Sequence, residues 1–200
     1  MKKVLVATAI VGALAAPQAF AQANDFVGFN VGVNVNLASS SAETSTGALS
    51  AHIGDTSQNV SLQGAYAFAV GGRGVLGLGL SYSLTSLKSG SLVVAGTDVE
   101  WRNNDLFSAY MEPGIVVDNA TLLYAKIAYV GGKGERISNG LIGSQNYYGI
   151  GCGAGARVFL SKHLYLQGEF MRSDYGERPI DGMPYKPSST IGSIGFGFKF

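Results

Sequence analysis

The chain has little cysteine, histidine or charge. A single cysteine, Cys152, excludes an internal disulfide framework. Charged residues make up only 14% of the chain and the formal net charge is +1, so no nucleic-acid surface is expected. The only histidines are His52 and His163, which is thin support for a metal centre or a catalytic base. We therefore expect no metal and no cofactor.

Only one long apolar run is present, at the start of the chain. A positively charged Met1-Lys2-Lys3 precedes an uncharged stretch over 4–20, and Ala19-Phe20-Ala21 is a small-x-small cleavage site. This pattern predicts a secretory signal peptide over residues 1–21, cleaved near Ala21. A membrane-spanning helix is the rival interpretation, because the run approaches the roughly 18 residues that indicate one. The Ala-rich end favours the signal peptide and leaves one domain, residues 22–200.

The remaining chain combines a positive mean hydropathy, +0.21, and 29 glycines with no second apolar run. The last ten residues show why: Ile194, Phe196, Phe198 and Phe200 alternate with small or polar residues. Alternation with period two predicts a β-strand with one apolar and one polar face. Eight segments share this pattern, at about 27–37, 60–70, 76–84, 107–117, 123–129, 148–158, 164–171 and 191–200.

The connections between these segments alternate in length. Short ones occur at 71–74, 118–119 and 161–163, and long polar ones at 38–57, 85–104, 131–146 and 176–188. An even number of antiparallel strands with short turns at one end and long loops at the other is typical of outer-membrane barrels. We predict an all-β fold, an eight-stranded antiparallel transmembrane β-barrel with short periplasmic turns and long extracellular loops. A soluble lipocalin-like barrel is the alternative, but it would carry more charge on its outer face.

The side of the barrel that each side chain faces follows from the same alternation. Cys152 is expected to face lipid. Aromatic residues near the strand ends are expected to form two interfacial belts. The belt near the long loops would contain Tyr82, Phe107, Tyr129 and Tyr148, and the belt near the turns Phe68, Phe196 and Phe198.

Five charged residues are expected to face the lumen. The turn at 118–119 places Glu112 opposite Lys126, and the turn at 161–163 places Arg157 opposite Gln167 with Glu169 diagonal to it. We predict that these couples form lumen charge pairs, either as a polar plug that keeps the barrel rigid or as a gate in a narrow ion path. Lys199 also points inward and has no obvious partner.

Other motifs give weaker signals. Gly149, Gly151 and Gly153 recur within a strand, so they are interpreted as small lumen residues and not as a phosphate loop. His52 lies near Ser50 and Asp55, a grouping that a lipid-modifying barrel enzyme could use. Nothing else supports catalysis, so an enzyme is not expected and no catalytic residue is assigned. The proline-containing loop at 176–188 could bind a host ligand or lipopolysaccharide, or be only a stiff solvated loop.

From Tyr147 to Gly176 the chain reads YYGIGCGAGARVFLSKHLYLQGEFMRSDYG. This stretch resembles the sixth and seventh strands of outer membrane protein A-like and opacity-type small outer-membrane β-barrels, which are porin-like in fold. The resemblance implies export to the outer membrane of a Gram-negative bacterium, where Phe200 would be the C-terminal signal for the assembly machinery. It also implies outer-membrane lipid and lipopolysaccharide as surroundings, and a structural or surface-interaction role at the cell surface. A narrow low-conductance channel is the alternative function.

Overall fold

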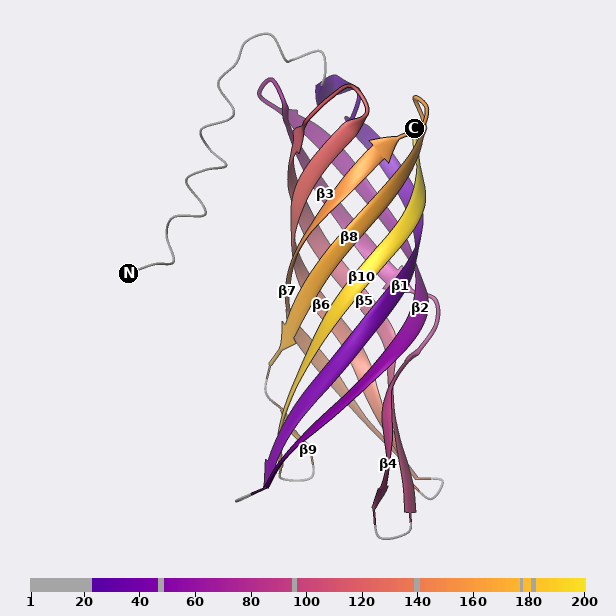
Figure 1. Ribbon diagram of the computed structural model, residues 1–200, viewed down its shortest axis with the longest axis vertical. Coiled ribbons are helices and arrows are strands. Elements are labelled where there is room, and N and C mark those ends of the chain that lie inside the picture. The colour runs from indigo at the N-terminus through magenta and orange to yellow at the C-terminus, as the bar shows by residue number, and fades with distance from the viewer. Residues whose placement is uncertain (1–22, 47–48, 95–96, 139–140, 177, 181–182) are drawn as a thin grey trace, which may run out of the picture.

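Strands make up nearly all of the described chain (Figure 1). The computed structural model describes residues 23–46, 49–94, 97–138, 141–176, 178–180 and 183–200. The predicted signal peptide lies outside these residues. No helix in the described ranges is long and apolar enough to cross a membrane. The strands are β1 (Gly28–Thr46), β2 (Leu49–Val70), β3 (Gly74–Ser83), β4 (Leu87–Val94), β5 (Thr97–Val116), β6 (Thr121–Ser138), β7 (Leu141–Phe159), β8 (Leu164–Tyr175), β9 (Arg178–Ile180) and β10 (Met183–Lys199).

Eight of these strands close into an antiparallel barrel, as the sequence predicted. The order around the ring is β1, β2, β3, β5, β6, β7, β8 and β10, and β10 pairs back onto β1. The short strands β4 and β9 lie off the ring order, where β4 pairs with the first residues of β5 and β9 with the first residues of β10. Closure pairs every barrel strand on both sides, which an open sheet in lipid could not achieve.

The register of pairing sets the tilt of the strands. A row of directly paired residues starts at Ser39 on β1 and passes once around the ring by way of β10. It returns to β1 at Phe29, ten residues nearer the N-terminus and the turns. An offset of ten in an eight-stranded ring tilts the strands by about 40° from the barrel axis, so that such a row descends about 3 Å per strand toward the turns. The row comprises Ser39, Thr190, Arg172, Cys152, Ile127, Met111, Leu78, Tyr66 and Phe29.

Large apolar side chains cover the outside of the barrel, and small or polar ones fill the inside. Ile194, Phe196 and Phe198 are exposed on β10, whereas Gly195 and Gly197 between them are buried. Gly197 is needed for space, because a Cβ there would clash with the ring of the wholly buried Tyr165. The alternation therefore places a lipid-facing surface outside and a lumen inside.

Both expected groups of aromatic residues lie on this outer face. Tyr129 stacks on Tyr148 with ring centroids 5.9 Å apart, and Phe107 contacts Tyr148 edge-on at 6.4 Å. At the turn end, Phe198 contacts both His163 and Phe200. We call the end of the barrel with the short connections the turn end and the other the hairpin end; the turn end is uppermost in Figure 1.

The prediction of four long loops was wrong in one respect. The strands continue past the aromatic residues of the hairpin end, so that β1 and β2 stay paired as far as Thr46 and Leu49. Likewise β6 and β7 stay paired as far as Ser138 and Leu141. These segments are polar and lack the apolar alternation, but backbone pairing between antiparallel strands does not require it.

The turn between β5 and β6 is held by its own side chain. The carboxylate of Asp118 accepts hydrogen bonds from the backbone N–H groups of Ala120 and Thr121, both at 2.8 Å. These hydrogen bonds hold the pKa of Asp118 below its usual value, and the bond from Ala120 has the largest effect.

Candidate functional site

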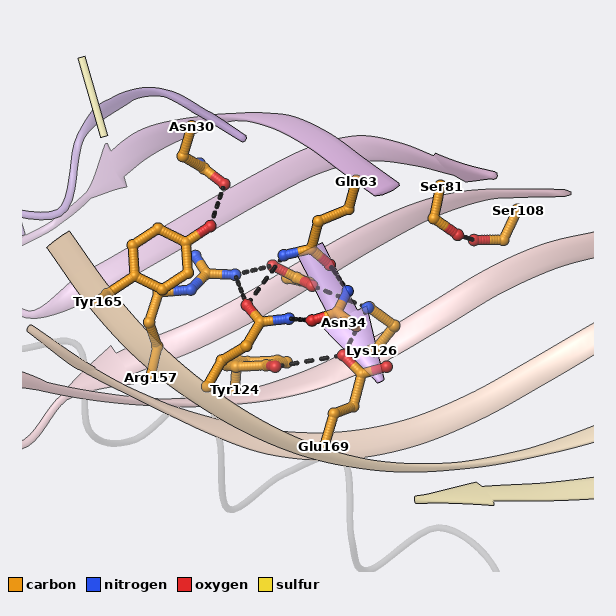
Figure 2. A network of polar contacts seen from close by, with 12 residues as sticks. Asn30, Asn34, Gln63, Ser81, Ser108, Tyr124, Lys126, Arg157, Tyr165 and Glu169 are labelled. Atoms are coloured by element: carbon orange, nitrogen blue, oxygen red, sulfur yellow. Dashed lines mark hydrogen bonds and ion pairs between the residues drawn. The ribbon is translucent and has the colours of Figure 1, made fainter. Parts of the chain in front are cut away.

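The four residues predicted to form lumen charge pairs lie in one buried cluster, contributed by four consecutive strands (Figure 2). Lys126 Nζ on β6 lies 3.1 Å from Glu112 Oε1 on β5 and 2.5 Å from Glu169 Oε2 on β8. Arg157 Nη2 on β7 lies 3.2 Å from Glu112 Oε2. We call these residues the ion cluster. The charges of its two carboxylates and two cations sum to zero.

The contacts within the ion cluster differ partly from those expected. Glu112 and Lys126 face each other across neighbouring strands, and Arg157 donates to Gln167 Oε1 at 3.2 Å. No ion pair joins Arg157 to Glu169 among the described residues, since Arg157 reaches past β6 to Glu112 and Glu169 pairs with Lys126. Inside a narrow barrel, long side chains converge on the axis and meet partners beyond the adjacent strand.

Tyrosine rings surround the two cations. Lys126 Nζ lies 4.1 Å from the ring centroid of Tyr110, and the Arg157 guanidinium lies 4.7 Å from that of Tyr165 and 5.4 Å from that of Tyr124. Cation–π contacts of this kind contribute more where water is excluded. The rings also fill the lumen, so they hold the cations where the carboxylates meet them.

Side-chain amides extend this network across the lumen. Gln63 Nε2 on β2 donates to Gln167 Oε1 on β8 at 2.9 Å, and Gln167 Nε2 donates to Asn34 Oδ1 at 2.9 Å. The hydroxyl of Tyr165 donates to Asn30 Oδ1 at 3.1 Å. β2 and β8 are separated by β1 and β10 in the ring, so the bond between Gln63 and Gln167 crosses the lumen. The lumen at this level is filled by side chains.

The turn end of the lumen is closed by an apolar plug that the sequence analysis missed. Residues 23–26 form one turn, in which Phe26 N–H donates to the carbonyl oxygen of Ala23 at 3.1 Å. Ala23 is 0% exposed and Phe26 4%. The Phe26 ring meets Phe159 edge-on, with centroids 5.0 Å apart. We call residues 23–26 the N-terminal plug; it packs with Ala67, Val75, Val116, Leu122 and Tyr124.

A small cavity with both polar and apolar lining residues lies on the hairpin side of the ion cluster. Its volume is about 80 Å³, and Lys126 and Glu169 are among its lining residues. A cavity of this size and polarity can hold several water molecules. The other polar residues around it are Asn34, Asn36, Asn59, Ser61, Gln63, Ser81, Ser83, Ser108 and Ser193.

The remaining candidates lie outside the ion cluster. Lys199 does have a partner, because its Nζ donates to the carbonyl oxygen of Asp25 at 2.5 Å and so ties the N-terminal plug to β10. Cys152 is exposed on the outer face, as predicted. The side chain of His52 is outside the described residues. Phe200 donates its N–H to the Phe29 carbonyl oxygen at 2.9 Å, and its role as an assembly signal stays a prediction.

Comparisons with known proteins agree with this architecture. A family model for the outer membrane protein β-barrel domain matches residues 6–200. No curated protein matches the chain.

Two solved structures share the fold at low sequence identity. The attachment invasion locus protein Ail of Yersinia pestis is 16% identical, with 87% of this chain and 99% of that chain covered and a TM-score of 0.52. Neisserial surface protein A is 14% identical, with 86% and 97% covered and a TM-score of 0.59.

Proposed function

The chain belongs to the outer-membrane β-barrel family. From this premise we propose that its lumen is closed to solutes and that its function lies in the strands that protrude from the membrane at the hairpin end. It sits in the outer membrane with its apolar face in lipid. The observation that carries the proposal is the pair of barriers in series along the lumen, the ion cluster and the N-terminal plug. A solute would have to displace both, so the hairpin end is the better place to seek a function.

Among the strands that protrude at the hairpin end, β7 has an edge that is partly unpaired. β7 pairs with β6 along its whole length, but its pairing with β8 stops at Gly149 opposite Tyr175. A last hydrogen bond runs from the N–H of Gly176 to the carbonyl oxygen of Tyr148, at 3.0 Å. By the two-residue alternation, the backbone groups of Asn146 and Ser144 point the same way as those of Tyr148.

This edge lacks three of the features that protect exposed strand edges. Residues 143–146 read Gly-Ser-Gln-Asn and are exposed, with no proline, lysine or bulge among them. Unprotected edges accept a further strand, and several recognition domains bind extended peptides in this way. The partner we propose is therefore an extended segment of an extracellular polypeptide, bound along β7 by backbone hydrogen bonds.

A sulfated polysaccharide is less favoured as the ligand. The Y. pestis protein has been crystallised with the heparin analogue sucrose octasulfate. In this chain the segments 38–57, 85–104, 131–146 and 176–188 contain six Lys or Arg and seven Asp or Glu. Such a balance provides no net attraction for a polyanion.

The test is panning of a phage-displayed peptide library on the refolded barrel in lipid nanodiscs. We expect enriched peptides that bind the wild-type chain and Ser144→Ala but lose binding to Ser144→Pro, because proline removes one N–H from the edge of β7. A normal gel shift on heating would show that the proline variant is folded. Failure to enrich peptides over empty nanodiscs would contradict the proposal, as would equal binding to the proline variant.

A narrow channel is the second candidate function. The cavity on the hairpin side of the ion cluster supports it, because this cavity reaches Lys126 and Glu169 and is large enough for water. Conduction would require the ion cluster to rearrange and the N-terminal plug to leave the turn end. Bilayer conductance separates this candidate from the first.

A further inference from the structure

One basic side chain of the barrel wall faces outward. Arg172 on β8 shares the outer face with Phe170, and its side chain is 65% exposed. The other described basic residues of the barrel wall, Lys126, Arg157 and Lys199, point into the lumen or toward the N-terminal plug. A cation on the lipid face is strongly destabilising at the bilayer midplane but nearly neutral near the interface. The depth of Arg172 therefore decides what it can do.

The register places Arg172 level with the aromatic belt of the hairpin end. Its row of paired residues runs through Cys152 on β7 to Ile127 on β6, two residues on the turn side of Tyr129. The row descends about 6 Å over these two strands, and two residues along a tilted strand rise about 5 Å. Arg172 is thus at the depth of Tyr129, where lipid headgroups meet the acyl chains.

A groove on the outer wall lies beside Arg172. Its volume is about 570 Å³ and its walls are largely apolar. Cys152, directly opposite Arg172 on β7, is one of its lining residues. Tyr129, Ile150, Arg172 and Asp174 also line it.

The guanidinium of Arg172 retains donors for a ligand. Within the described part of the chain its one partner is Asp174, whose Oδ1 lies 3.6 Å from Nε. Both side chains are about two-thirds exposed, so this ion pair is weak. The ion pair occupies the Nε side of the guanidinium and leaves its terminal N–H groups available to a ligand. These planar N–H donors match the geometry of two phosphate oxygens. Asp174 lies on the water side of Arg172.

We propose that this groove binds a phosphorylated glycolipid of the outer leaflet, with a phosphate on Arg172 and an acyl chain along Cys152 and Ile150. The proposal goes beyond the surface function above, since this site is on the lipid-facing wall at β7 and β8 below the protruding strands. Charge complementarity at headgroup depth, next to an apolar groove, distinguishes it from the general contact of a barrel with lipid.

Native mass spectrometry of the refolded chain in neutral micelles, titrated with diphosphoryl lipid A, tests this site. We expect Arg172→Gln to weaken binding by about tenfold or more, the effect of losing a hydrogen bond to a charged group. Arg172→Lys should fall between Gln and wild type. The matched control is Lys133→Gln, because Lys133 lies on β6 beyond the belt and pairs with Glu135 at 3.2 Å. That control should bind like wild type.

Fully dephosphorylated lipid A with the same acyl chains separates the phosphate from the groove. The affinity of the wild-type chain for dephosphorylated lipid A should be no higher than the affinity of Arg172→Gln for diphosphoryl lipid A. The proposal would be overturned by equal binding of diphosphoryl lipid A to wild type and Arg172→Gln. Equal binding of the two lipids to wild type would overturn it as well, because recognition would then rest on acyl chains alone.

Discussion

Neutralising Glu112 should destabilise the barrel more than any exposed charge change. Glu112 is 3% exposed and lies within 3.2 Å of both Lys126 and Arg157. In Glu112→Gln, Glu169 alone would face two buried cations. Breaking a buried pair by removing one partner costs about 3–5 kcal/mol, so we expect a loss of that size in the free energy of unfolding.

Equilibrium urea unfolding of the refolded chain in lipid vesicles measures this loss, with gel mobility as the readout of the folded state. The matched control is Glu135→Gln, because the Lys133–Glu135 pair has a similar distance, 3.2 Å, but is partly exposed. Exposed pairs contribute about 0–1 kcal/mol. In the double variant Glu112→Gln/Arg157→Gln the remaining charges balance, so its loss should be smaller than the sum of the single losses. If Glu112→Gln cost no more than Glu135→Gln, the reasoning would be refuted.

Two further substitutions test the packing of the lumen. Phe26→Ala removes the main contact of the N-terminal plug with Phe159 and should cost about 3–5 kcal/mol in urea unfolding; a similar loss from the lipid-facing Phe68→Ala would argue against a specific role for the plug. Gly197→Ala drives a methyl group into the ring of Tyr165 and should lower the free energy of unfolding by about 1–3 kcal/mol. Refolding gels should show this loss as a smaller folded fraction. Gly168→Ala, which has nothing within 4 Å of the added Cβ, should refold like wild type, and equal refolding of the two glycine variants would show that the space at 197 is unimportant.

The sidedness of every barrel strand could be predicted from the sequence because two different environments meet at the barrel wall. Lipid outside and a narrow lumen inside impose a period of two, and the terminal strand shows it plainly at Phe196 and Gly197. The protruding strands could not be predicted in this way. Residues such as Ser144 and Asn146 are exposed together with their neighbours, so no apolar face marks them as strand.

The ion cluster could be predicted only where hairpin geometry determines it. Glu112 and Lys126 are related by one short turn, which sets their register. Arg157 meets Glu112 from two strands away, a contact that depends on the curvature of the closed barrel. Phe26 was missed because it precedes the first alternating segment, although a large aromatic residue at a lumen-parity position was an available signal.

Planar-bilayer conductance of the refolded chain tests the central claim most directly. The ion cluster and the N-terminal plug predict a silent membrane at protein levels where gels show a folded barrel. Reproducible openings whose conductance changes in Glu112→Gln or Lys126→Gln would contradict a closed lumen and establish the narrow channel in its place.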